Sequence, residues 1–198
     1  MSPHFLQGLL SRRSQGIKHL SAPGPSAEDL RQMARAALRA PDHGELVPFR
    51  FRVVEGPQRE ALGDLFAEHA ASIGKSGATA DLERERALRA PVTVAVIARI
   101  DPGHPQVPVH EQWMCVGGAV TNFLNAAHAL GYSGKVLSGN KVRGPAIIRA
   151  FCGPGEQLVA WIAVGTGTRE PHVAERDATE VLQPWTPGRD AGVTVPDR

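Results

Sequence analysis

The sequence of 198 residues predicts an α+β protein in which helices and strands form mixed layers. Two uninterrupted apolar segments, 92–100 and 157–165, are typical of strands that are buried on both faces. The segments around them carry apolar residues at the three- and four-residue spacing of helices. Because the two kinds of segment alternate along the chain, we expect about three or four strands and about five helices.

Two helices are expected before the first strand. The segment 4–13 is a short amphipathic helix, because its four large apolar residues fall on one face. A second helix begins after Ser26, whose hydroxyl suits an N-cap, and carries two carboxylates in its first turn, where they suit the helix dipole. Pro41 ends this helix.

The next elements are a strand, a helix and a charged segment. Residues 49–55 alternate in polarity and end at a glycine, which is typical of a strand. A helix follows from Pro57 and is broken at Gly74. The charged segment 81–86 has two interpretations, a solvated helix or a mobile excursion.

The longest helix is expected over 110–130, after a proline-rich loop at 101–109. One of its faces is apolar, the other is rich in glycine and alanine, and Gly131 provides a natural C-terminal stop. Residues 132–138 are expected to form a short strand or an extended loop, and residues 145–151 a short helix.

The chain is expected to divide into one domain and a tail. Residues 1–168 hold all the periodic segments, whereas residues 169–198 form a proline-rich extension. We expect this extension to dock on the domain or on a partner subunit, because Val181, Leu182 and Trp185 are apolar anchors.

Composition excludes several functional classes. With 22 basic and 20 acidic residues, the net charge of +2 is too small to indicate a nucleic-acid partner. No apolar run approaches the roughly 20 residues of a membrane span. The first residues lack the pattern of a secretory signal, so a cytoplasmic protein is expected.

Cysteine and histidine spacing argues against a metal or dithiol site. Cys115 and Cys152 form no CxxC pair and lie among apolar residues, so we expect buried, inert thiols. The spacing of His104, His110 and Glu111 matches no standard metal site.

Two short motifs remain as candidates for binding. Arg12, Arg13 and Ser14 offer two guanidiniums and a hydroxyl in close succession, which suits a phosphate monoester, although arginines at a helix end are usually solvated. Arg39 and His43 flank a proline turn and could grip a planar polar ligand, or they could simply lie at the surface.

These motifs resemble the nitroreductase family, in particular its small NAD(P)H nitroreductases of the YdjA type. The resemblance covers roughly residues 4–168 and rests on three motifs in this order: RRS at 12–14, RAPDH at 39–43 and HALGYSG at 128–134. It implies a mostly antiparallel central sheet flanked by helices, and a homodimer with non-covalent FMN at the subunit interface. It also implies hydride transfer from NADH or NADPH through FMN to nitro compounds, quinones or similar small acceptors by a ping-pong mechanism.

The resemblance also assigns site residues by position. The flavin, chiefly its phosphate end, would be bound by Arg12, Arg13 and Ser14, and Arg39 and His43 would reach it from the neighbouring subunit. Three residues of a further segment would also touch FMN: Val136, Leu137 and Ser138. The nicotinamide cofactor would approach residues 126–131.

The sequence departs from the family pattern at two places. The third flavin segment typically holds an aromatic residue and an arginine where Val136 and Leu137 stand, and Lys135 or Lys141 could compensate. The pattern Gln-Pro-Trp is replaced by Val-Pro-Phe at 47–49.

No catalytic triad or carboxylate pair stands out, which suits a reaction that the flavin itself carries. Arg13 is the candidate for stabilising negative charge near N1 and the C2 oxygen of reduced flavin, and His43 is a candidate proton donor. Other functions stay open: a flavin- or nucleotide-binding protein without turnover, an enzyme that consumes its own flavin, or an anion- or nucleic-acid-binding module. The last would use an arginine stripe at Arg31, Arg35 and Arg39.

Overall fold

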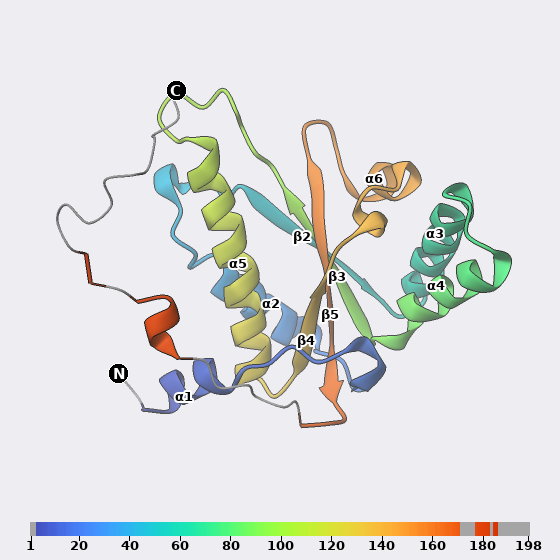
Figure 1. Ribbon diagram of the computed structural model, residues 1–198, viewed down its shortest axis with the longest axis horizontal. Coiled ribbons are helices and arrows are strands. Elements are labelled where there is room, and N and C mark those ends of the chain that lie inside the picture. The colour runs from blue at the N-terminus through green and yellow to red at the C-terminus, as the bar shows by residue number, and fades with distance from the viewer. Residues whose placement is uncertain (1–2, 171–176, 183, 186–198) are drawn as a thin grey trace.

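The computed structural model describes residues 3–170, 177–182 and 184–185 (Figure 1). The predicted extension at 169–198 therefore lies largely outside the described residues. Its three expected anchors are exposed in the single chain.

The helices and strands alternate along the chain, as the sequence predicts. The α-helices are α1 (Pro3–Ser11), α2 (Ala27–Ala37), α3 (Gln58–Ser72), α4 (Gly77–Arg89), α5 (Val109–Ala129) and α6 (Pro145–Phe151). The strands are β1 (Leu20–Ser21), β2 (Phe49–Glu55), β3 (Val92–Ala98), β4 (Ser133–Leu137) and β5 (Gln157–Gly167). Short 3-10 helices are η1 (Ile17–His19), η2 (His43–Glu45), η3 (Asn140–Val142) and η4 (Ala178–Glu180).

The strand β5 organises the sheet. It pairs with β1, β3 and β4, and β3 pairs in turn with β2. All of these pairings are antiparallel, so the prediction of a mostly antiparallel sheet is confirmed. The register sets Val94 opposite Ile162 on one side of β5 and Val136 opposite Ile162 on the other.

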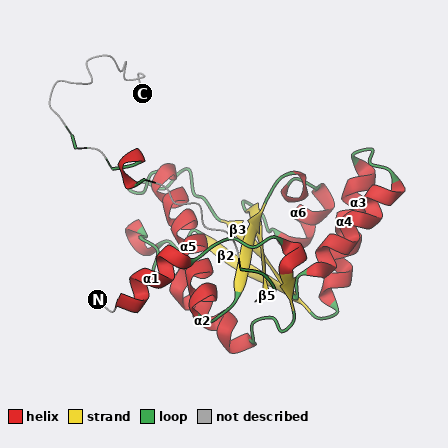
Figure 2. Ribbon diagram, turned by 60° about the horizontal axis from the view of Figure 1, so that its bottom comes forward, coloured by secondary structure: helices red, strands yellow, loops and turns green. Residues whose placement is uncertain are grey.

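Helices cover both faces of the sheet. Figure 2 shows α1, α2 and α5 on one side and α3, α4 and α6 on the other. Residues of β3 alternate between the two cores: Val94 and Val96 pack with α2 and α5, whereas Ala95 and Ile97 belong to the core under α3, α4 and α6. Burial on both faces explains why the sequence of β3 is apolar throughout.

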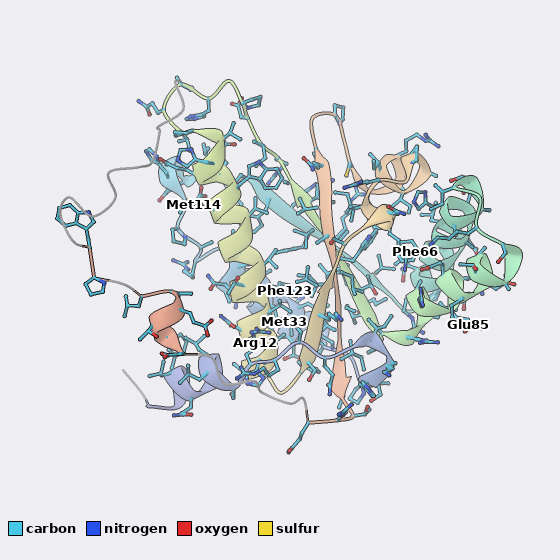
Figure 3. All side chains as sticks on the ribbon, viewed as in Figure 1. Arg12, Met33, Phe66, Glu85, Met114 and Phe123 are labelled. Carbon is cyan, nitrogen blue, oxygen red and sulfur yellow. The ribbon has the colours of Figure 1, made fainter. Side chains whose placement is uncertain are left out.

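Large side chains fill each core, as Figure 3 shows for three of them. Met33 and Phe123 lie between the sheet and the α2/α5 layer, and Phe66 lies on the opposite side. The ring of Phe123 stacks at a tilt against Phe51 of β2, with centroids 4.9 Å apart. Burial of one such side chain contributes about 1.5–3 kcal/mol.

Specific local interactions form the helix ends that the sequence predicts. Ser26 caps α2 in a capping box with Asp29, whose carboxylate accepts from the Ser26 amide. The prediction that Gly131 stops α5 is confirmed by its φ of 86°, a left-handed conformation that favours glycine. The end of α2 lies at Ala37 rather than at Pro41, because a tighter turn already follows Ala37.

The structure confirms several of the expected elements and corrects others. The bounds 49–55 and 145–151 are confirmed, and 132–138 contains a strand. The two-residue strand β1 was not expected, since so short a segment has no periodicity, and α4 raises the number of α-helices in the described ranges to six. The charged segment 81–86 lies within α4, so its interpretation as a mobile excursion is wrong.

The two thiols differ in burial. Cys115 is buried, and its pKa is raised to about 11, first by burial and then by the neighbouring carboxylate of Asp42. Cys152 is half-buried, which corrects the expectation for it, but burial still raises its pKa. Both groups therefore stay protonated thiols at neutral pH, as expected of inert cysteines. Within the described part of the chain, no helix combines the length and apolar character of a membrane span.

Candidate functional site

An isolated bridge joins two of the predicted site segments. Ser14 pairs in parallel with Gly134 of β4, and the amide of Gln15 donates to the Gly134 carbonyl at 3.1 Å. A Cβ at position 134 would lie 2.9 Å from Leu124 Cδ2 and 3.2 Å from the Ala163 carbonyl, so glycine here lets β4 pack closely against α5 and β5. The segment 12–14 therefore lies beside the strand that carries Val136 and Leu137.

The three residues of the RRS motif have different roles in the structure. Arg13 donates from Nη1 to the carbonyls of Leu10, at 2.5 Å, and Arg12, at 2.7 Å, so its guanidinium closes the C-terminal end of α1. Arg12 is half-buried, its guanidinium makes no ion pair or hydrogen bond within the described residues, and Ser14 is exposed. Arg12 and Ser14 are thus available to an anion in this conformation.

A cavity of about 230 Å³ opens at the far end of β4. Its lining combines aromatic side chains with two cations and the end of the predicted third segment. The lining residues that matter here are Phe66, Arg86, Leu137, Ser138, Lys141 and Trp161. Of the two lysines proposed to compensate for the missing arginine, Lys141 lines this cavity and Lys135 does not.

The aromatic part of the lining is rigidly packed. Trp161 meets Phe66 and Phe151 edge-on, with ring centroids 5.3 and 4.9 Å apart. Trp161 is buried, and its indole N–H has no acceptor among the residues that the structure describes.

The two cations of the cavity share one buried carboxylate, that of Glu83 in α4. Lys141 Nζ lies 2.5 Å from Glu83 Oε2, Arg86 Nη1 lies 2.8 Å from Oε1, and Lys75 Nζ lies 3.5 Å from Oε1. Burial alone would raise the pKa of Glu83, but the contact with Lys141 and the three positive charges outweigh it, so the pKa is lowered. Glu83 is therefore a charged group in the interior.

Sequence reasoning missed Arg86 and Glu83. Both belong to the charged segment 81–86, whose composition indicates a solvated surface. The signal that could have found them is the alternation of sign in this segment next to a buried strand, because a carboxylate that is flanked by cations can be buried.

Arg39 and His43 lie on the opposite side of the sheet, near the end of α2. Arg39 lines a hollow of about 600 Å³ between α1, α2 and α5, together with Ala126 and Ala129. The Nδ1 atom of His43 lies 2.7 Å from Glu111 Oε2 of α5. No hydrogen bond or ion pair of the described residues joins either side chain to 12–14 or 136–138, so one chain alone does not assemble all the predicted site residues.

The loop after His43 is strained. Val47 has a φ of 46°, which is rare for a β-branched residue. Its amide donates to Asp42 Oδ2 at 2.7 Å, and its carbonyl accepts from Arg99 at 3.2 Å. Strain that is held by several hydrogen bonds is typical of ligand-contacting loops. Among the described residues, no cluster of three or more side chains could hold a metal ion.

Comparison with known proteins identifies the fold and the family. The family model described as "Nitroreductase family" matches residues 9–166. A protein of Haemophilus influenzae named "Putative NAD(P)H nitroreductase" is 35% identical over 170 residues, which cover 85% of this chain and 90% of that protein. The Escherichia coli K12 protein named "Putative NAD(P)H nitroreductase YdjA" is 35% identical over 162 residues, covering 81% and 87%.

Solved structures show the same fold. A nitroreductase-like protein of Bacillus cereus superposes with a TM-score of 0.76 at 21% identity, covering 91% of this chain and 95% of that one. A nitroreductase from Desulfovibrio desulfuricans, solved in complex with FMN, has a TM-score of 0.68 at 26% identity, covering 94% and 99%. The mostly antiparallel sheet between helical layers, the RRS segment beside β4 and the match over 9–166 lead to one conclusion: the chain belongs to the nitroreductase family.

Proposed function

We propose that the protein is an FMN-dependent oxidoreductase that takes hydride from NADH or NADPH and passes it to nitro compounds, quinones or a similar small acceptor by a ping-pong mechanism. The observation that carries this proposal is the bridge between Ser14 and Gly134, which sets the RRS segment beside the strand that leads to the cationic cavity. Membership of the family and the names of its relatives support the same activity.

The residues present fit FMN. Arg12 and Ser14 suit its phosphate end, since a guanidinium and a hydroxyl are donors to phosphate oxygens. The cavity at Leu137 and Ser138 suits part of the flavin ring, because apolar and aromatic side chains form much of its wall. When bound, FMN would supply the hydride chemistry, while these side chains bind and orient it. The related Desulfovibrio desulfuricans structure holds FMN.

A second copy of the chain would complete the site. The cavity of about 230 Å³ is smaller than the roughly 300–1,000 Å³ of typical ligand pockets. The RRS segment of the proposed site directly follows α1, and α1 and α5 expose Leu6, Leu10 and Met114, the last with 71% of its surface accessible. We therefore propose a homodimer in which this apolar face is buried and Arg39 and His43 approach the partner's flavin.

An absorption spectrum tests the proposal. The purified protein should show the yellow absorption of FMN, lose it on addition of NADPH without oxygen, and regain it when a quinone is added. A colourless protein that takes up no added FMN would refute the proposal. Initial rates at several quinone concentrations should give the parallel double-reciprocal lines of a ping-pong mechanism.

A second candidate is a flavin-binding protein on the same fold with little turnover. It is favoured by Val136 and Leu137, which stand where the family pattern has an aromatic residue and an arginine. Steady-state oxidation of NADPH with a quinone separates the two functions. The reductase turns over many times per flavin, whereas a binding protein bleaches at most once.

A further inference from the structure

The two cations that line the cavity at the end of β4 share a single carboxylate, which lies outside the lining. Arg86 and Lys141 line the cavity, whereas Lys75, which also contacts Glu83, is not part of the lining. Glu83 is 6% exposed and contacts all three cations. One buried carboxylate between three cations leaves an excess of positive charge, part of which faces the cavity.

The position of Lys141 is fixed from two sides. Its Nζ lies 2.5 Å from Glu83 and 4.8 Å from the centroid of the Phe66 ring, in a cation–π arrangement. Phe66 is itself held edge-on against Trp161. A long flexible side chain is thereby ordered before any ligand binds, which is the condition for an electrostatic contribution to binding.

Leu137 shows why this charge comes from another element. It packs with Ile17 and with the core that contains Trp161, so position 137 contributes apolar contact and no charge. Lys141 follows in η3 and lines the same cavity. In this chain the positive charge at the cavity therefore comes from Lys141 in η3 and not from position 137 in β4.

We propose that Lys141, positioned by the buried Glu83 and assisted by Arg86, supplies the positive charge that stabilises the negatively charged edge of reduced FMN in this protein. The inference rests on the proposed FMN function and deepens it. It assigns Lys141 as a flavin-binding residue and Glu83 as a positioning residue. Because the charge favours the reduced over the oxidised cofactor, it should act on the midpoint potential as well as on affinity.

The test compares two lysines that contact the same carboxylate. Lys141→Met removes the cavity cation, whereas Lys75→Met removes a partner of Glu83 that does not line the cavity. The holoprotein is stripped of FMN and refilled, the affinity for oxidised FMN is measured by flavin fluorescence, and the midpoint potential by equilibration with a reference dye. Lys141→Met should weaken binding of reduced FMN about tenfold more than that of oxidised FMN, which moves the potential about 30 mV lower.

Two further variants make the result decisive. Leu137→Arg added to Lys141→Met should restore the potential, because it returns a cation to the same cavity. Arg86→Met, at a more exposed position of α4, should lower the potential in the same direction and covers the case in which Lys141→Met does not fold.

The results distinguish a failure of the role given to Lys141 from a failure of the proposed FMN function. If Lys141→Met and Arg86→Met keep the potential and affinity of Lys75→Met, the cluster only joins α4 to η3 and the inference is overturned. If the unaltered protein binds no FMN, the proposed function fails and the inference falls with it.

Discussion

Ser14 and Gly134 pair as a parallel bridge between the RRS segment and β4. Gly134 is also packed tightly on its other neighbours, since a Cβ at position 134 would lie 2.9 Å from Leu124 Cδ2 and 3.2 Å from the Ala163 carbonyl. The geometry of the proposed FMN site therefore depends on a residue that has no side chain to contact the cofactor.

Gly134→Ala should destabilise the protein by about 1–3 kcal/mol, because the buried methyl group must displace either Leu124 or the sheet. The FMN affinity should fall with it, because a shift of β4 displaces the backbone to which Ser14 and Gln15 are bridged. Urea unfolding and FMN titration measure the two effects. Gly77→Ala is the matched control, because a Cβ at this exposed position meets no atom within 4 Å, and it should change stability by less than about 0.5 kcal/mol. Equal losses in both variants would contradict the role given to the bridge.

Arg12→Ala should lower the affinity for FMN at least tenfold, a loss of about 1.4 kcal/mol, since its guanidinium is the one left available to a phosphate. Arg13→Ala should mainly lower the thermal stability of α1, because Arg13 donates to the carbonyls of Leu10 and Arg12. FMN titration of both variants, together with thermal unfolding, separates the two roles. A larger loss of affinity in Arg13→Ala would show that Arg13 turns toward the flavin when FMN binds.

The ion pair of Arg50 and Glu156 should make stability depend on pH in the acid range. Hydrogen bonds from Arg50 and from the Gly153 amide lower the pKa of Glu156 to about 2, from the usual 4.5. The charged form is favoured in the native state, so its contribution is full above about pH 4.5 and is lost as the pH falls toward 2. Glu156→Gln should cost about 2 kcal/mol at pH 7.

The difference between wild type and Glu156→Gln should shrink below pH 4.5 in urea unfolding experiments. Glu68→Gln, at an exposed position of α3, is the control and should show no such convergence. A constant difference between pH 7 and pH 3 would disprove the assignment to Glu156.

Met114→Arg should weaken the proposed dimer at least tenfold, because it places a charge in the exposed apolar face of α5. Sedimentation velocity at several concentrations measures this effect, and the FMN content of the variant should fall in parallel. Ile73→Arg is the control, since Ile73 is 45% exposed at the end of α3 on the other side of the sheet. Dissociation by Ile73→Arg but not by Met114→Arg would move the interface to the other face.

Local patterns in the sequence predict most of the fold. The alternation in 49–55, the apolar runs of β3 and β5, the cap at Ser26 and the stop at Gly131 all depend on neighbouring residues, and the structure confirms them. The strand β1 escaped prediction because its two residues are defined only by pairing with β5.

The site could be predicted only in part, because its parts meet through long-range contacts. The RRS and 136–138 segments were found through the family resemblance, but the bridge that joins them follows from the sheet register. The burial of Glu83 could not be predicted, because it depends on cations at positions 75, 86 and 141, of which the last belongs to η3. The helix-capping role of Arg13 likewise depends on a side-chain conformation that no spacing rule specifies.

The pairing of β5 also constrains the order of folding. β5 follows β1, β3 and β4 along the chain and forms hydrogen bonds with each of them. During synthesis, the apolar β3 must therefore leave the ribosome well before its central neighbour exists. Pairing across such sequence distances is slow and leaves apolar strands exposed in the nascent chain. Truncation before residue 157 would accordingly leave a chain whose sheet lacks its central strand and which is prone to aggregate.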